Sequence, residues 1–520
     1  MAERFVEPLP ARPNLEMQHK RAKDLLRAAW ESDAGALARI RALHPKPPAP
    51  NALKLADALL VVARGYGFES WAALKQKIES LTMSPVERFM SAIRRQDVAE
   101  VRLLLEGNAE VRAAINAPIG YFDGRPAAAA KKNLALLDVL LQYGADLNLK
   151  SAWWAGPFGI LDYDCTPEEA APLIERGANV DVFAAAHLGM FDRLRTLIEQ
   201  DPSLVRARGG DGKTALHSAR TVEIASYLLE QGAEIDARDV DHESTAAQYL
   251  ARDPSGVARF LVDSGAWFDI FIAIALGDPA LVERCLRDDA NALDHRTGQG
   301  EYKVGHDGAR PAPSERIRRG DIYRWVFEHN VTALDVAKSI GDEKILNLLL
   351  AHASPAQRLL AACSHGERVS AESVAAANPD IVRRLTPEQM KLIAYKAYGN
   401  DTAAVTLMLD LGFDALVKGP EDWEPIRWAA FHGNATLVKR LLAHNPPIGV
   451  PDVRYEGTPL GMCIYGSLHG WSCKTGEFAS TARLLLNAGE RPKPSDLPTG
   501  RDDVDAVLRE YLAREARSPS

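Results

Sequence analysis

Residues 140–145 read LLQYGA, and similar segments follow as LIERGA at 173–178, LLEQGA at 228–233 and LVDSGA at 261–266. The first two copies are 33 residues apart, and so are the last two. The Gly after each apolar run is typical of a helix that ends on a residue in the left-handed conformation. A fixed period near 33 indicates a stack of repeated supersecondary units, each packed on its neighbours.

A second pattern marks where the first helix of a unit begins. Residues 212–219 read GKTALHSA, and weaker versions are TALDVA at 332–337 and TPLG at 458–461, while 428–434 read WAAFHGN. These segments resemble the ankyrin family, whose units open on a Thr-Pro-Leu-His-like tetrad. The resemblance covers about residues 84–492. It implies an all-α ankyrin-repeat solenoid of roughly twelve degenerate helix-turn-helix units. It also implies that Thr214 and His217 tie the turn to the helix by hydrogen bonds.

Residues 1–82 do not follow the repeat and predict a helical capping domain. Helices are expected over 15–40, 53–64 and 71–81, the last with Ser70 as its N-cap. We then expect a first repeat array over 84–295, an insertion loop over 296–325, a second array over 326–492, and a C-terminal cap helix and tail over 493–520. The whole chain also looks like a group of bacterial ankyrin-repeat proteins, a likeness that implies no activity.

Charge and composition exclude several function classes. The net charge is −8, and residues 1–82 carry 13 Lys and Arg against 9 Asp and Glu, whereas the remainder carries 49 against 61. An acidic majority argues against a nucleic-acid partner. Five scattered cysteines, no secretory leader and no long apolar run favour a cytoplasmic protein without a membrane span. No dinucleotide or phosphate-loop motif occurs, so we expect no cofactor.

Three segments break the repeat and are the candidates for function. They are 151–165, with Trp153 and Trp154; the insertion 296–325, with Arg318 and Trp325; and 455–477. Loops of such length inside compact repeats tend to be functional or disordered. The basic run around Arg318 is either an anion-binding site or a solvated loop. In the first segment, Thr166 as N-cap before Pro167 accounts for the neighbouring acidic residues as a helix start.

The region 428–473 concentrates reactive side chains. The candidate binding residues there are Trp428, His432, Tyr455, Tyr465, His469 and Trp471, and the catalytic candidates are His432, His469 and Tyr465. The structural interpretation is that His432 ends a first helix and that the tryptophans fill gaps between units. His469 with Cys463 and Cys473 can be combined into a zinc site only without family spacing, so no metal site is predicted.

Two functions remain open at this point. The first is a binding scaffold that holds a protein partner on the concave face of the solenoid, with exposed aromatic residues as hot spots. The second is a non-redox enzyme or small-molecule-binding protein of isomerase, cyclase or lyase type, with a pocket of His, Tyr and Trp in the concavity. The second requires the broken repeats to meet at one place.

Overall fold

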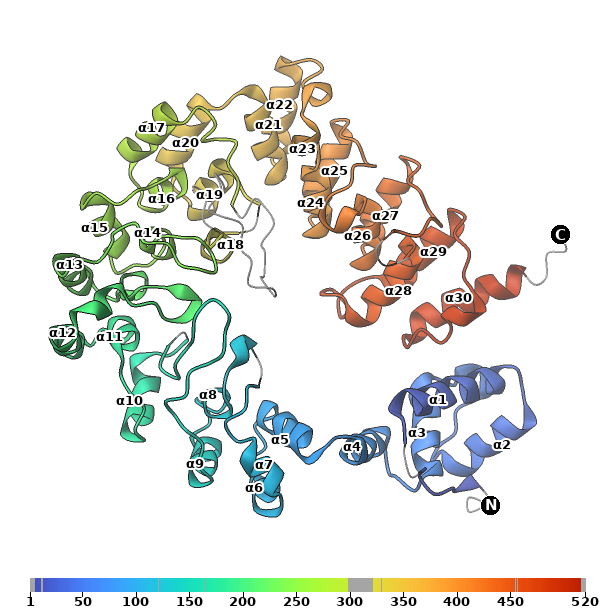
Figure 1. Cartoon of the computed structure of the whole chain (residues 1–520). Coiled ribbons are helices and arrows are strands. Elements are labelled where there is room, and N and C mark those ends of the chain that lie inside the picture. Colours follow the sequence, from blue (N-terminus) through green and yellow to red (C-terminus); the bar gives the residue numbers. More distant parts are fainter. Residues whose placement is uncertain are drawn as a thin grey trace. The chain divides into compact units, whose positions relative to one another are not determined.

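The computed structural model describes residues 5–10, 13–119, 121–162, 164–297, 321–328, 330–453, 455 and 457–515. Its regular elements are α-helices and short 3-10 helices (Figure 1). Within the described residues, extended backbone pairs only at two isolated bridges, Arg238 with Thr245 and Arg296 with Thr332. The chain is therefore an all-α repeat protein, as the 33-residue period predicts.

The chain forms two compact units, residues 1–82 with 354–520 and residues 83–353. The second of these, the middle unit, contains α5 (Pro85–Arg94), α6 (Val98–Gly107), α7 (Ala109–Ala113), α8 (Pro126–Ala129), α9 (Leu134–Gln142), α10 (Pro167–Glu175), α11 (Val182–Leu188), α12 (Phe191–Gln200), α13 (Val222–Glu230), α14 (Ala246–Tyr249), α15 (Val257–Asp263), α16 (Ile270–Ala275), α17 (Pro279–Asp288), α18 (Tyr323–Val326), α19 (Ala333–Ile340) and α20 (Glu343–His352).

The other unit, the terminal unit, joins both ends of the sequence. Its N-terminal module contains α1 (Leu15–Trp30), α2 (Ala34–Leu43), α3 (Leu55–Gly65) and α4 (Trp71–Thr82). Its C-terminal part contains α21 (Pro355–Ser364), α22 (Arg368–Ala377), α23 (Pro387–Met390), α24 (Leu392–Tyr398), α25 (Thr402–Asp410), α26 (Pro425–Phe431), α27 (Ala435–Leu442), α28 (Pro459–His469), α29 (Phe478–Asn487) and α30 (Asp502–Glu515).

The four copies of the repeated phrase make the same helix end. In each copy the glycine has a positive φ between 90° and 97°, and the N–H of the following alanine donates to the carbonyl oxygen of the first leucine. These N···O distances are 2.9–3.0 Å. At Gly144, Gly177 and Gly265 an added Cβ would meet open space, so the backbone conformation and not crowding requires glycine.

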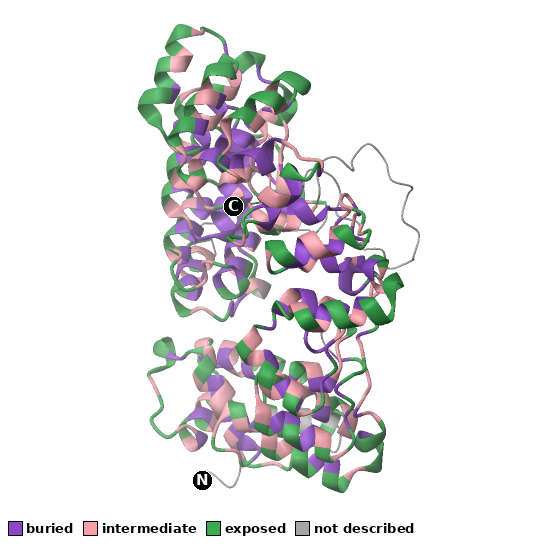
Figure 2. Ribbon diagram, turned by 90° about the vertical axis from the view of Figure 1, so that its left-hand side faces the viewer, coloured by how far each residue is buried: buried purple, intermediate pink, exposed green. Residues whose placement is uncertain are grey.

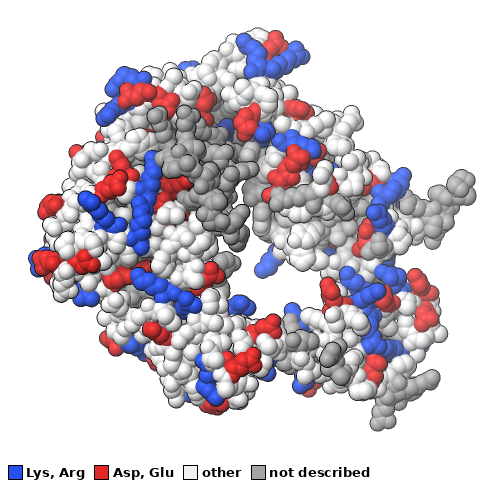
Figure 3. All heavy atoms as spheres, viewed as in Figure 1, with Lys and Arg blue, Asp and Glu red and all other residues white. Residues whose placement is uncertain are grey.

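Short helices stack side against side, and their apolar faces form the core. In the terminal unit the first helices α24, α26 and α28 pack in sequence, and so do the second helices α25, α27 and α29. In Figure 2 the buried positions gather where helices face one another. Figure 3 shows acidic and basic side chains interspersed over the visible face. Among the described helices, none is both long and apolar enough to cross a bilayer.

The N-terminal module differs from the sequence expectation in one helix. The helix predicted over 15–40 is two helices, because Ser32 has a φ of 63° and Asp33 begins α2 by accepting a hydrogen bond from the Ala36 N–H. The Ser70 cap is confirmed by its bond from the Ala73 N–H. The Thr166 cap is also confirmed, with a reciprocal bond to Glu169.

Candidate functional site

The structure separates the predicted site residues into two clusters, one in each unit. Trp153, Trp154 and Trp325 belong to the middle unit, whereas the candidates from Trp428 to Trp471 belong to the terminal unit. Arg318 lies outside the described residues. Each cluster is described separately below.

Seven rings of the terminal unit form an aromatic patch along three successive first helices. Buried Trp428 lies 4.7 Å from the Tyr398 ring, 4.5 Å from Trp423 and 6.2 Å from Trp471, centroid to centroid. The patch also contains Phe431, Tyr455 and Tyr465. Trp471, Tyr465 and Tyr455 remain 64%, 56% and 53% exposed. Buried rings therefore support exposed ones, and the patch offers an apolar surface with a fixed geometry.

His432 lies under this patch and has a protein partner at each ring nitrogen. Nε2 lies 2.9 Å from the Tyr398 carbonyl oxygen, and Nδ1 lies 3.1 Å from the Ser472 hydroxyl oxygen. The first contact requires the proton on Nε2, so Nδ1 accepts the Ser472 hydroxyl. Burial lowers the pKa of His432. His432 follows the last residue of α26, so it ends a first helix as the structural interpretation expects. Its two hydrogen bonds link neighbouring repeats.

The other two catalytic candidates, His469 and Tyr465, do not take part in the hydrogen bonds of His432. His469 is exposed, and its ring packs at a tilt against Tyr465, 4.8 Å between centroids. Cys463 is buried with its thiol toward the Phe478 carbonyl, and burial raises its pKa. Within the described residues, the one group of His, Cys, Asp and Glu close enough to share a metal ion is in the middle unit. The arrangement in the terminal unit therefore suits contact with a partner better than proton transfer.

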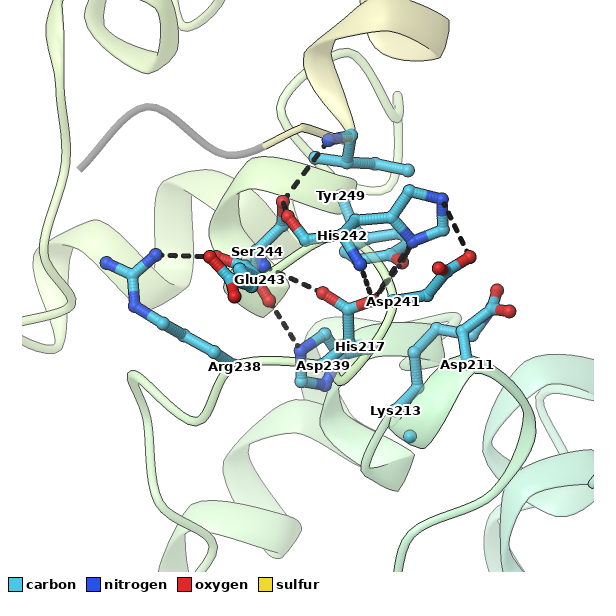
Figure 4. A network of polar contacts seen from close by, with 12 residues as sticks. Asp211, Lys213, His217, Arg238, Asp239, Asp241, His242, Glu243, Ser244 and Tyr249 are labelled. Carbon is cyan, nitrogen blue, oxygen red and sulfur yellow. Dashed lines mark hydrogen bonds and ion pairs between the residues drawn. The ribbon is translucent and has the colours of Figure 1, made fainter. Parts of the chain in front are cut away.

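The middle unit holds a polar network that the sequence analysis did not predict. Its members are Asp211, Lys213, His217, Asp239, Asp241, His242, Ser244 and Tyr249 (Figure 4). Asp239 is central, because its carboxylate accepts the backbone N–H groups of His242 and Ser244, each at 2.7 Å. It also accepts the Tyr249 hydroxyl at 3.0 Å. These bonds hold the turn 239–244 in one conformation.

His242 is placed between carboxylates. Its Nδ1 is 3.0 Å from Asp239 Oδ2 and 2.7 Å from the Tyr249 oxygen, and its Nε2 is 3.7 Å from Asp241 Oδ2. Burial by itself would lower the pKa of His242. The hydrogen bond to Asp239 and the charges of Asp239, Asp241 and Asp211 outweigh it and raise that pKa.

Asp211 connects this turn to the first broken repeat. Its Oδ1 accepts the Trp153 indole N–H at 3.1 Å, and its Oδ2 is 3.6 Å from the Lys213 ammonium. That ammonium also lies over the rings of Phe158 and Tyr249, at 5.7 and 5.3 Å. Burial raises the pKa of Asp211. Trp153 therefore contacts the network, and Trp154 packs on Trp153 at 5.9 Å.

The second broken repeat reaches the same network through α18. The Asp321 N–H donates to the His242 carbonyl at 3.0 Å, and the Ile322 N–H donates to Ser244 Oγ at 3.2 Å. Trp325 then packs edge-on against the His242 ring at 4.9 Å. The neighbouring Tyr323 hydroxyl donates to Asp269, the half-buried N-cap of α16. Two of the three broken repeats thus contact the polar network, the first at Asp211 and the second at the turn 239–244.

His217 has the structural role that the resemblance implies. Its Nδ1 accepts the Thr214 N–H at 3.2 Å, and its Nε2 donates to the Ser244 carbonyl at 3.1 Å. The segment it closes is a 3-10 helix, Ala215–Ser218, and not an α-helix. The sequence signal for the network was the run DVDH at 239–242, which follows the GDG turn at 210–212 in the next repeat. Neither run has a known metal-ligand spacing, which is why it was missed.

One family model agrees with the repeated helix pairs. The sequence model of the ankyrin repeat matches residues 211–240, which include Asp211, His217 and Asp239. No curated protein matches the sequence.

Many solved structures resemble parts of the chain, and two of them serve as examples. One is a chain in the complex of the predatory endopeptidase Bd0816 from Bdellovibrio bacteriovorus with immunity protein Bd3460. It is 21% identical with a TM-score of 0.22, and the match covers 34% of this chain and 97% of that one. The other is the human ASB11 ankyrin repeat domain, 15% identical with a TM-score of 0.22, covering 61% and 100%. Likenesses this low transfer neither activity nor partner to this chain.

Proposed function

Because the chain is an ankyrin-repeat protein, we propose that it is a binding scaffold whose concave face, on the first-helix side of the repeats, holds a protein partner. The observation that carries the proposal is the aromatic patch. Its rings come from three successive units, α24, α26 and α28 with their flanking turns. A partner that covered Tyr455, Tyr465 and Trp471 would remove large apolar surfaces from water at one place.

The support beneath these side chains favours binding. Trp471 packs on Phe431 at 5.6 Å and on Tyr398 at 5.1 Å, so its ring is held before a partner arrives. Pre-ordered aromatic side chains lose little conformational entropy on binding, which makes them effective anchors. A proton-transfer enzyme at this site is not proposed, since both ring nitrogens of His432 have protein partners.

Site-specific photocrosslinking in cells tests the proposed face. A benzophenone amino acid replaces Tyr465 or Trp471, and the control position is Val369 in α22, which is 83% exposed. We expect one protein to be crosslinked from both aromatic positions and not from position 369. Equal capture from all three positions would refute the proposal.

The partner identified in this way allows a quantitative check. Tyr465→Ala and Trp471→Ala should each weaken its affinity by at least about 5-fold, because truncation of a hot-spot aromatic costs more than about 1 kcal/mol. Val369→Ala is the matched control and should leave the affinity unchanged. Circular dichroism confirms that the variants remain folded, and unchanged affinity in both aromatic variants would contradict the assignment.

A further inference from the structure

Three ligand atoms of the polar network converge within the middle unit. One atom each from Asp211, Asp241 and His242 lies within 4.8 Å of the other two, and all three residues are buried. His242 Nε2 and Asp241 Oδ2 are 3.7 Å apart. In a tetrahedral zinc site with bonds of about 2.1 Å, ligand atoms are separated by about 3.4 Å. Small side-chain movements would therefore bring the three atoms to one ion.

The His242 ring is oriented by Asp239 and Tyr249, which are not among the three ligand residues. Nδ1 of His242 faces Asp239 and Tyr249, which leaves Nε2 directed at Asp241 (Figure 4). A carboxylate on the far nitrogen of a metal-bound histidine is the usual outer-shell arrangement, because it selects the tautomer and raises the basicity of the ligating nitrogen. Asp239 is held for this task by two backbone N–H groups.

The two turns that supply the ligands are already joined through their backbones. The Asp211 carbonyl accepts the N–H groups of Val240 and Asp241 at 2.8 and 3.1 Å. Trp153 fixes one oxygen of the Asp211 carboxylate from a third segment. Ligands on pre-ordered turns need little rearrangement when an ion arrives, and that favours binding.

The charge of the network favours a cation. Three buried carboxylates, those of Asp211, Asp239 and Asp241, lie around the His242 ring. Gathered anionic groups are costly away from water unless positive charge compensates them. Lys213, at 3.6 Å from Asp211, supplies some compensation and is the group that competes with an ion.

We propose that Asp211, Asp241 and His242 form a binding site for one divalent transition-metal ion of the zinc type. One imidazole and two carboxylates suit Zn²⁺, and three protein ligands leave a coordination position for water or for a group of a bound molecule. The ion would join two consecutive repeats beneath Trp325 and α18. This site is distinct from the aromatic patch and does not rest on the proposed scaffold function.

The test is calorimetric titration of the chelator-treated full chain with Zn²⁺. We expect one ion per chain, loss of that ion in Asp241→Asn and in His242→Gln, and a higher Tm of the wild type with Zn²⁺. Asp239→Asn should weaken binding by about 10- to 100-fold, because it removes an outer-shell partner. Lys213→Met should tighten binding.

The controls are an acidic residue and a histidine on the surface of the same unit. Asp263→Asn and His352→Gln replace exposed side chains and should bind Zn²⁺ as the wild type does. Failure of the wild type to bind, or wild-type binding by both Asp241→Asn and His242→Gln, would overturn the site.

A measurement on the wild type alone covers the case in which a ligand variant fails to fold. Co²⁺ bound at this site should give d–d absorption from nitrogen and oxygen ligands only. Thiolate-to-Co²⁺ charge-transfer bands would instead place the ion on a cysteine and overturn the assignment. Neither readout involves the aromatic patch, so failure here leaves the scaffold proposal standing.

Discussion

At the scale of the residue, His217 is a buried histidine that must stay neutral. It accepts a hydrogen bond at Nδ1 and donates one at Nε2, so its protonated form would lose the Thr214 contact. Burial lowers its pKa from 6.5 to about 4. The unfolded chain therefore binds a proton at a higher pH than the folded chain does, and acid destabilises the fold through this residue.

The pH dependence of unfolding checks this role. The contribution of His217 is present in full above pH 6.5 and is lost as the pH falls from 6.5 to 4. The pKa difference makes it roughly 3 kcal/mol. His217→Asn should flatten the pH profile of the unfolding free energy over this interval, measured by urea denaturation. His352→Asn, at an exposed position, should leave the profile unchanged, and identical profiles for both variants would refute the role.

Arg427 is a buried cation whose hydrogen-bond partners lie in two neighbouring repeats of the terminal unit. Its Nε donates to Glu424 at 2.8 Å, and its terminal nitrogens donate to the carbonyls of Gly457 at 2.5 Å and Val450 at 2.7 Å. Its side chain is 3% exposed. It therefore links the start of α26 to the loop that precedes α28.

Removal of this cation should be costly. Arg427→Met strands the buried Glu424 carboxylate, so we expect a loss of about 3–5 kcal/mol in unfolding free energy. Glu424→Leu combined with Arg427→Met should recover part of that loss, since it leaves no uncompensated charge. Urea denaturation of both variants measures the difference, and a double variant no more stable than the single one would contradict the argument.

At the scale of the element, α28 contains two glycines with different surroundings. An added Cβ at Gly466 would overlap the Phe431 carbonyl oxygen of α26, whereas one at Gly461 would lie 3.6 Å from Thr458 Oγ1. Gly466 therefore permits the close approach of two first helices on which the aromatic patch is built. Gly461 has no such role.

Alanine substitutions at the two positions should act in opposite directions. Gly466→Ala should lower the unfolding free energy by about 1–3 kcal/mol through overpacking. Gly461→Ala should raise it by up to about 1 kcal/mol, because alanine has the higher helix propensity. Thermal denaturation followed by circular dichroism compares them. Equal changes in Tm would show that the α26–α28 approach does not depend on Gly466.

At the scale of the whole molecule, the N-terminal module packs on the last helix within the terminal unit. The Arg509 guanidinium lies 3.8 Å from the centroid of the Trp30 ring, and Lys54 pairs with Asp502 at 2.6 Å. Arg27 also donates to the Leu497 carbonyl at 3.0 Å. The module therefore contacts α30, where a repeat stack would otherwise end on an exposed face.

Hydrogen exchange tests this contact. Arg509→Ala should speed amide exchange in α1 and α30 by about 2- to 30-fold, the range expected for a cation–π contact of roughly 0.5–2 kcal/mol. Residues 83–353 should not change. Arg514→Ala is the control in the same helix, because its bond to Glu510 lies within α30. Equal effects of the two variants on α1 would contradict the docking.

The local features of this protein are predictable from sequence because their hydrogen bonds join residues only three to five positions apart. Each glycine helix end is closed by one backbone hydrogen bond between residues five positions apart. The Thr166 cap is closed by reciprocal hydrogen bonds with Glu169, three positions later. The pairing of Thr214 with His217 is equally short-range. The expected helix over 15–40 was wrong because the left-handed residue Ser32 gave no such signal.

The polar network was not predictable in the same way. Trp153, Asp211 and His242 lie in different repeats, and Trp325 ends the insertion 296–325. Which of them meet depends on how the units stack, and stacking is set by packing between helices distant in sequence. The repeat period therefore established the architecture, while the convergence of two broken repeats on the polar network arose from packing between repeats within the middle unit.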